Sequence, residues 1–388
     1  MAAELDFVVG RAGTGKTSLI LEEISSRLRE QPLGPSLVLL LPEHMTYKLE
    51  RQLAEGLAEN GHGFMRASVF GFRRFARQVL LETGGAGLPR ISDVGRQLML
   101  RKLLLRHLQA GDLTVFARSA RQRGFTESLA DIIKEVRTYR LPTELLRETA
   151  SGLGKGRLSG KLREIAQLVD DFQQEMKGKA NDSEDLMALL AEKIPLSQQL
   201  QGAEIWLDGF VFFNPQEMEV ISSLFSVAKA VHIVLPMAGS EGPNGTVCLE
   251  LPENERETGL FSRSCQTYKA LLEAWRQAGG KGKPAVRLMQ ENRRARKPAL
   301  AWVEKNLFIS GGAPCSEGQG LKLVEAANRR LEVESIASDI LRLARSGWRY
   351  KDMGVLVHYR LELPDLGKSN GKIDSFGNYT VVTYTRMQ

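Results

Sequence analysis

Short apolar runs alternate with amphipathic patterns over the first 90 residues of the chain. Three of these runs have the length of buried strands, namely Leu5–Val9, Ser36–Leu41 and Arg66–Phe70. Apolar residues then recur every three or four positions, which predicts helices at about Ser18–Arg29, after Pro42 to Leu57, and at Phe72–Glu82. Strands that alternate with helices are typical of a parallel sheet flanked by helices, so we expect an α/β fold.

The pattern changes between Ser92 and Lys193, where no run resembles a strand. Apolar residues in this region keep helical spacing, as at Leu100, Leu103 and Leu104. Glycine and proline residues divide the region into several helices. We therefore predict a helical insertion subdomain over residues 91–199, placed within the α/β domain.

The α/β pattern returns after this region. It predicts a strand that starts at Glu204 and ends near Asp208, a helix at Pro215–Ala228 and a strand at Ala230–Leu235. Further along it predicts an irregular loop at Gly239–Gly259, helices at about Gln266–Ala278, Ala299–Asn306 and Glu332–Ser346, and strands at Leu321–Glu325 and Met353–His358. Residues 1–90 and 200–325 then form one domain, and residues 326–388 begin a second, incomplete α/β domain.

Composition agrees with a soluble globular protein, with 43% apolar and 26% charged residues. No apolar run approaches the ~20 residues that a membrane span requires, and the N-terminus lacks a basic segment ahead of an apolar one. Cys248, Cys265 and Cys315 lie far apart, which excludes a disulfide framework or a local metal site. We expect a cytoplasmic protein with no membrane partner.

Positive charge is concentrated in two stretches of a chain whose formal net charge is +7. Between Arg66 and Arg140, 15 Lys and Arg stand against 6 Asp and Glu, a local net of +9. Between Arg276 and Lys305, nine basic residues stand against two acidic ones. Such clusters are typical of surfaces that contact nucleic-acid phosphates, although a solvated helical face has the same composition.

The segment Phe70–Phe75 combines aromatic and basic residues. Its rings could stack on bases while its arginines meet phosphates. Phe72 and Phe75 are equally suited to the hydrophobic core of a helix, and we favour the core.

A glycine-rich motif of the form G-x-x-x-x-G-K-[ST] follows the first strand at once, and comprises Gly10, Arg11, Ala12, Gly13, Thr14, Gly15, Lys16 and Thr17. Its glycines let backbone N–H groups turn toward a phosphate, helped by the positive end of the next helix. In such sites the lysine, here Lys16, reaches the β- and γ-phosphates and the hydroxyl, here of Thr17, binds Mg²⁺. The motif therefore predicts binding of ATP with Mg²⁺.

A magnesium site of this type needs a second, acidic ligand at the end of a neighbouring strand. Asp208 is the best candidate because an apolar run precedes it. In a hydrolysing motor this Asp is usually followed by a Glu that orients the attacking water, but here Gly209 follows. Glu217 and Glu43 are other acids that could take this role. We expect the site to bind ATP–Mg²⁺ better than it hydrolyses it, and we assign no catalytic residue.

The order of several segments along the chain resembles a known family. These segments are LLLPEHMTYKLE, VFGFRRFARQVLLETGG, ISDVGRQLMLRKLL, IWLDGF followed by PQE, and LEVESIASDILRL followed by GWRYKDMGVLV. Together with the phosphate loop they resemble the N-terminal part of the AddB subunits of AddAB helicase–nucleases, over about residues 5–357. The combination is more specific than the phosphate loop alone.

This resemblance implies a fold like that of superfamily 1 helicases, in which a RecA-like P-loop domain carries a helical insertion. It also implies a role in processing double-strand breaks for recombinational repair. The implied partners are DNA, as a single strand or a duplex end, and an AddA-type helicase–nuclease subunit. In this family the AddB subunit has a degenerate motor that scans DNA, which agrees with Gly209 and with the lack of a G-D-x-x-Q motif after Ala230–Leu235.

Full-length members of the family continue into a second helicase-like domain and a nuclease domain with a four-cysteine iron–sulfur cluster. The sequence stops resembling the family after His358, so we expect neither nuclease residues nor the cluster in this chain. Our hypothesis is an ATP-binding, DNA-binding, N-terminal fragment of a helicase–nuclease subunit. One alternative is a non-catalytic scaffold whose P-loop serves assembly only, and another is an independent P-loop ATPase or kinase.

Overall fold

The chain forms two compact units, residues 1–295 and 296–388. A computed structural model describes residues 2–58, 64–85, 91–177, 183–243, 247–251, 259–295, 297–306, 314–315 and 318–355. None of the described helices is both long and apolar enough to cross a membrane.

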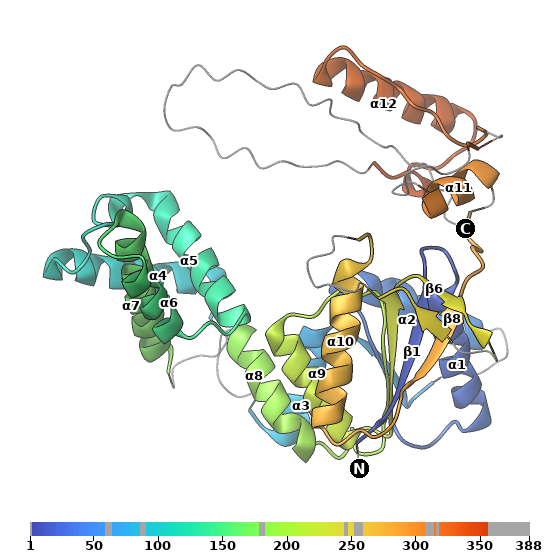
Figure 1. Cartoon of the computed structure of the whole chain (residues 1–388), viewed down its shortest axis with the longest axis horizontal. Coiled ribbons are helices and arrows are strands. Elements are labelled where there is room, and N and C mark those ends of the chain that lie inside the picture. Colours follow the sequence, from blue (N-terminus) through green and yellow to red (C-terminus); the bar gives the residue numbers. More distant parts are fainter. Residues whose placement is uncertain are drawn as a thin grey trace. The chain divides into compact units, whose positions relative to one another are not determined.

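Six parallel strands form the sheet of the first unit, in the order β3–β2–β4–β5–β1–β8 (Figure 1). Their bounds are Glu4–Gly10 for β1, Leu37–Leu40 for β2, Ala67–Phe70 for β3, Glu204–Leu207 for β4, Ala230–Pro236 for β5 and Ala285–Met289 for β8. β1 lies inside the sheet, where Gly10 is opposite both Pro236 of β5 and Met289 of β8. The predicted parallel α/β fold is confirmed, and β8 is a strand that the sequence pattern did not predict.

Helices cover both faces of this sheet (Figure 1). The helices that pack on it are α1 (Lys16–Glu30), α2 (Glu43–Ala58), α3 (Phe72–Thr83), α8 (Ser183–Lys193), α9 (Pro215–Val227) and α10 (Ser262–Gln277). α1 and α2 share a core with Val8 of β1, whereas α3, α8, α9 and α10 share the opposite core with Phe7 and Val9. Successive side chains of a strand point to opposite faces, so the buried residues Phe7, Val8 and Val9 make β1 apolar on both sides.

The region between α3 and α8 is helical and has a core of its own. It consists of α4 (Asp93–Ala110), the short helix η1 (Ser119–Arg121), α5 (Arg123–Thr138), α6 (Thr143–Gly152) and α7 (Arg157–Met176). Leu103 and Leu104 of α4, Ile133 of α5 and Phe172 of α7 are buried together. This apolar spacing explains why these helices pack against one another. The insertion subdomain over residues 91–199 stays a prediction as a domain, and α8, which lies within those bounds, packs in the core of the sheet.

Two short segments differ from the expectations. The stretch expected to be an irregular loop contains a two-stranded antiparallel ribbon, β6 (Gly239–Glu241) with β7 (Val247–Leu249). The expected strand at Leu321–Glu325 is wrong, because these residues are irregular and exposed. A strand needs a neighbour for its backbone N–H and C=O groups, and apolar alternation alone does not supply one.

The second unit is helical where it is described. It contains α11 (Pro298–Asn306), α12 (Arg329–Arg345) and the short helix η4 (Tyr350–Asp352). Residues 353–355 of the expected strand Met353–His358 are irregular, and the rest of that strand lies outside the described residues.

Candidate nucleotide-binding site

The phosphate loop connects the carboxyl end of β1 to the amino end of α1. Gly15 precedes the helix in the left-handed conformation, with φ of 85°. A side chain would strain this conformation, so glycine lets the loop turn directly into the helix. The first turn of α1 reads Lys-Thr-Ser-Leu, so the positive end of the helix dipole carries no acidic residue that would compete with a bound anion.

Lys16 lies over the loop. Its Nζ donates hydrogen bonds to the carbonyl oxygens of Gly10 and Arg11, both at 2.7 Å. The Thr14 hydroxyl also donates to the Arg11 carbonyl, at 3.0 Å. A phosphate in the loop would offer Lys16 charge-assisted hydrogen bonds, which are stronger than those to neutral carbonyls.

Asp208 follows β4, and its carboxylate reaches Thr17 although β5 lies between β4 and β1. Thr17 Oγ1 donates to Asp208 Oδ2 at 2.7 Å, and the Gly209 N–H donates to Oδ1 at 2.7 Å. Asp208 is only 4% exposed. Burial raises the pKa of its carboxyl, and the Thr17 and Gly209 hydrogen bonds and the Lys16 charge lower it only in part. The two residues predicted to hold Mg²⁺ are therefore brought together.

A metal ion here would depend on the nucleotide for further ligands. Within the described parts of the chain, no three His, Cys, Asp or Glu side chains gather as a metal site. Magnesium commonly keeps several waters and takes one or two protein ligands beside substrate phosphates. The hydroxyl and carboxylate of Thr17 and Asp208 fit that chemistry.

The turn Asn292–Arg294, which follows β8, also lies against the phosphate loop and was not predicted. The backbone N–H groups of Arg293 and Arg294 donate to the Gly13 carbonyl at 2.8 and 3.2 Å. The Asn292 side chain donates to the Ala12 carbonyl at 3.4 Å. The sequence showed only that this turn belongs to a basic stretch, because the strand that delivers it was missed.

A family profile described as "ADDB, N-terminal" matches residues 7–304. This chain belongs to the AddB N-terminal family. Among curated relatives, it is 39% identical to a protein of Desulforudis audaxviator, over 91% of this chain and 30% of that protein. It is 37% identical to one of Heliobacterium modesticaldum, over 91% of this chain and 29% of that protein. It is 38% identical to one of Geobacillus thermodenitrificans, over 94% and 31%.

All three relatives are named as the B subunit of an ATP-dependent helicase/deoxyribonuclease. The chain spans about 30% of the length of these relatives. The resemblance to AddB subunits that the sequence segments indicated is confirmed. The matching profile describes the N-terminal part of those subunits.

In this AddB-type chain the two acids named as substitutes for the missing Glu have structural hydrogen bonds. Glu217 and Asn214 form a reciprocal cap at the start of α9, each side chain accepting from the backbone N–H of the other at 2.9 Å. Burial raises the pKa of Glu217. Glu43 accepts from the N–H of Arg73 at 3.3 Å, at the start of α3.

Gly209 occupies the position where a hydrolysing motor has its Glu. Its φ is 82°, in the left-handed region that disfavours a side chain. A Cβ at this position would lie 2.7 Å from Met45 Sδ and 3.0 Å from Pro42 Cδ. The backbone and the packing here both oppose a Glu, which is why Gly209 is needed after Asp208.

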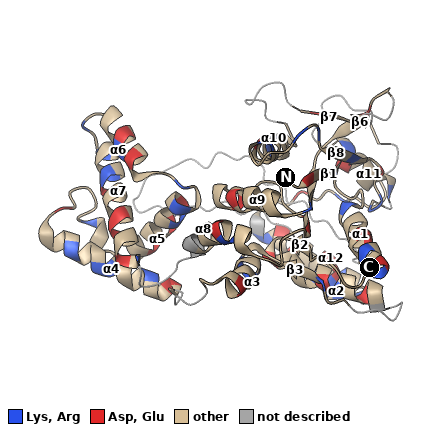
Figure 2. Cartoon of the chain, turned by 90° about the horizontal axis from the view of Figure 1, so that it is seen from below, with Lys and Arg blue, Asp and Glu red and all other residues tan. Residues whose placement is uncertain are grey.

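The basic stretch from Arg66 to Arg140 is partly engaged within this AddB-type chain. Its internal partners include the Pro35 carbonyl for Arg66, the Ala120 carbonyl for Arg101, Glu175 for Arg106 and Glu219 for Arg140. Asp and Glu also lie among the Lys and Arg of the insertion helices (Figure 2). Phe72 and Phe75 are 7% and 1% exposed, so the core interpretation of these two rings is confirmed.

Proposed function

We propose that this chain is the ATP–Mg²⁺-binding, DNA-binding N-terminal part of an AddB-type helicase–nuclease subunit for double-strand break processing and recombinational repair. The contact between Thr17 and Asp208 carries the nucleotide part of this proposal, because it joins a hydroxyl and a carboxylate beside the loop lysine. The names of the relatives, which cover a longer protein, support the rest.

Each part of the loop has a role in nucleotide binding. The N–H groups at the start of α1 face the phosphates, and Lys16 exchanges its carbonyl partners for the β- and γ-phosphate oxygens. With Mg²⁺ bound beside the phosphates, Thr17 would be one of its ligands and Asp208 would hold it through water. The buried Asp208 carboxylate has a raised pKa, so the arrival of a cation stabilises its charged form.

The motor is degenerate in this proposal. Hydrolysis needs a residue that orients the attacking water at the γ-phosphate, and a motor usually uses the Glu after the magnesium-binding Asp. Gly209 cannot be replaced by Glu without meeting Met45 and Pro42, and Glu217 is held in its helix cap. Nucleotide binding therefore acts as a conformational signal, while an AddA-type partner subunit supplies the motor activity.

The test is nucleotide binding by the purified full chain, with Lys16→Ala compared with wild type. We expect the K16A variant to lose ATP affinity by about 100-fold or more, which corresponds to about 2.8 kcal/mol or more of binding free energy. Lys48→Ala, which removes an exposed lysine of α2, is the matched control and keeps wild-type affinity. Titration with a fluorescent ATP analogue in Mg²⁺ measures both.

Unchanged affinity in K16A would refute the nucleotide site. ATP turnover of several per second by wild type, with or without single-stranded DNA, would contradict the degenerate motor. DNA affinity that falls steeply with salt supports the DNA-binding part. Partner binding that ignores ATP, together with no DNA affinity, would instead favour the scaffold alternative.

A further inference from the structure

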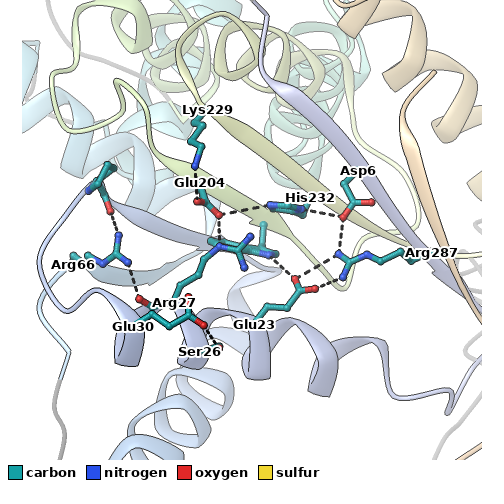
Figure 3. A network of polar contacts seen from close by, with 12 residues as sticks. Asp6, Glu23, Ser26, Arg27, Glu30, Arg66, Glu204, Lys229, His232 and Arg287 are labelled. Carbon is teal, nitrogen blue, oxygen red and sulfur yellow. Dashed lines mark hydrogen bonds and ion pairs between the residues drawn. The ribbon is translucent and has the colours of Figure 1, made fainter. Parts of the chain in front are cut away.

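A network of charged side chains crosses the sheet beneath α1 (Figure 3). It joins Asp6 of β1, Arg287 of β8, His232 of β5, Glu204 of β4, and Glu23 and Arg27 of α1. The side chains of Asp6 and Glu23 are only 16% and 19% exposed. A largely buried carboxylate without a cation destabilises the fold, so the residue that neutralises these two carboxylates is important for the local structure.

Arg287 is the cation that these two carboxylates share. Its Nη2 donates to Asp6 Oδ2 at 2.6 Å. Its Nη1 donates to Glu23 Oε1, and Nη2 lies 3.5 Å from Glu23 Oε2. A guanidinium can do this because its donors form a planar fork that serves two acceptors at once.

The two carboxylates stand on either side of the phosphate loop in the sequence. Asp6 lies in β1, four residues before Gly10, and Glu23 lies in α1, six residues after Thr17. β1 and α1 are regular elements, so a tie between them fixes the distance and angle at which the loop must connect them. The convergence of the loop N–H groups on a phosphate depends on that curvature.

We propose that Arg287 is a positioning residue of the nucleotide site, which joins Asp6 to Glu23 and thereby sets the geometry of the phosphate loop. This inference rests on the proposed nucleotide binding. β8 and the turn after it then contact the site in two ways. Arg287 binds Asp6 of β1, and the turn Asn292–Arg294 donates hydrogen bonds to the Gly13 carbonyl of the loop.

Other groups face the same carboxylates. His232 Nδ1 lies 3.1 Å from Asp6 Oδ2, and its Nε2 lies 4.0 Å from Glu204 Oε2. The Trp206 indole N–H donates to Glu23 Oε2 at 3.4 Å. Beyond them, Glu204 is paired with Arg27 and Lys229. Without Arg287, Asp6 keeps the His232 ring as a hydrogen-bond partner.

The experiment measures ATP–Mg²⁺ affinity of the full chain for wild type, Arg287→Met and Arg287→Lys. We expect R287M to bind about tenfold more weakly, a loss of about 1.4 kcal/mol. R287K should recover part of the affinity, because an ammonium restores the charge but not the fork. Glu23→Gln combined with R287M should recover part of it too, because it removes one unpaired carboxylate.

Arg147→Met is the matched control. Arg147 pairs with Asp170 in the helical insertion, away from the loop, and its loss should leave ATP affinity unchanged. A residue that serves stability alone would leave the ATP affinity of R287M equal to that of wild type at a temperature where all variants are folded.

Wild-type affinity in folded R287M, or an equal loss in R147M, would overturn the proposal. If R287M does not fold, the ATP affinities of R287K and E23Q are measured instead. Wild-type affinity in both variants would overturn the proposal. The K16A variant distinguishes a failure of the proposed nucleotide site from a failure of the positioning role of Arg287. If K16A loses ATP and R287M does not, the nucleotide site stands and the positioning role fails.

Discussion

Two buried carboxylates, one in the helical insertion and one beside the phosphate loop, differ in how fully they are hydrogen-bonded. Glu164 of α7 accepts four hydrogen bonds of 2.7–2.9 Å, from the N–H groups of Thr114, Val115 and Phe116 and from the Thr114 hydroxyl. Burial raises its pKa, but these donors outweigh burial and the net pKa is lowered. Asp208 accepts two hydrogen bonds, and burial leaves its pKa raised.

The difference separates a carboxylate that holds structure from one that has capacity left for a ligand. Glu164 fixes the loop between α4 and α5, and its donors satisfy its charge. Asp208 is buried beside Lys16 and Thr17 with fewer donors than an ionised carboxylate can use. A cation at Asp208 therefore gains more than a cation at Glu164 would.

Of the changes at these two carboxylates, Asp208→Asn has the largest expected effect, which is on nucleotide binding. We expect the Mg²⁺-dependent part of ATP affinity to fall by about 10- to 100-fold, as for other residues that orient a metal's ligands. Titration in Mg²⁺ and in EDTA separates that part from phosphate binding. A raised folded-state pKa means that ionised Asp208 costs stability at neutral pH, so D208N should leave the free energy of unfolding unchanged or raise it. If D208N binds ATP–Mg²⁺ normally but unfolds more easily, Asp208 is a structural carboxylate like Glu164, which contradicts the comparison.

Glu164→Gln should have the opposite profile. The amide nitrogen would face a backbone donor where the carboxylate accepts, and we expect a loss of about 1–3 kcal/mol in the free energy of unfolding. Urea unfolding followed by circular dichroism measures this loss. ATP affinity should not change. A loss of ATP affinity with unchanged stability would mean that the insertion communicates with the loop.

The smallest effect is the pH dependence of this loss. The folded-state pKa of Glu164 is lowered, so its contribution to stability is present above the pKa of the unfolded chain and disappears as the pH falls through the folded-state value. The gap in unfolding free energy between wild type and E164Q should therefore shrink by about 1 kcal/mol in acid. A gap that stays constant from neutral pH into acid would show that the charge of Glu164 contributes nothing.

Much of the fold and the core of the site could be predicted from the sequence. The strands β1, β2, β4 and β5 consist mainly of buried apolar residues, and such runs predict strands clearly. The loop motif and the apolar run before Asp208 were enough to pair Thr17 with a carboxylate 191 residues away, because parallel strands end at one edge of the sheet. That the two bind Mg²⁺ stays a prediction.

The sequence failed where a segment depends on its neighbours. β8 is an edge strand with Arg287 at its centre, and its apolar run is too short and too charged to stand out. Missing it also hid the turn Asn292–Arg294. Leu321–Glu325 has the alternation of a strand, yet these residues are exposed and irregular. Apolar periodicity predicts which side chains are buried. It does not predict whether a neighbouring strand is present to pair with the backbone.

The place of β1 in the sheet has a consequence for how the chain folds during synthesis. β1 is made more than 200 residues before its two neighbours in the sheet, β5 and β8. Contacts of such long range close slowly, and an unpaired strand is prone to wrong pairing until they form. The phosphate loop can therefore assume its final geometry only after the ribosome has passed Met289. The phosphate loop leaves the ribosome long before the two strands that complete its surroundings.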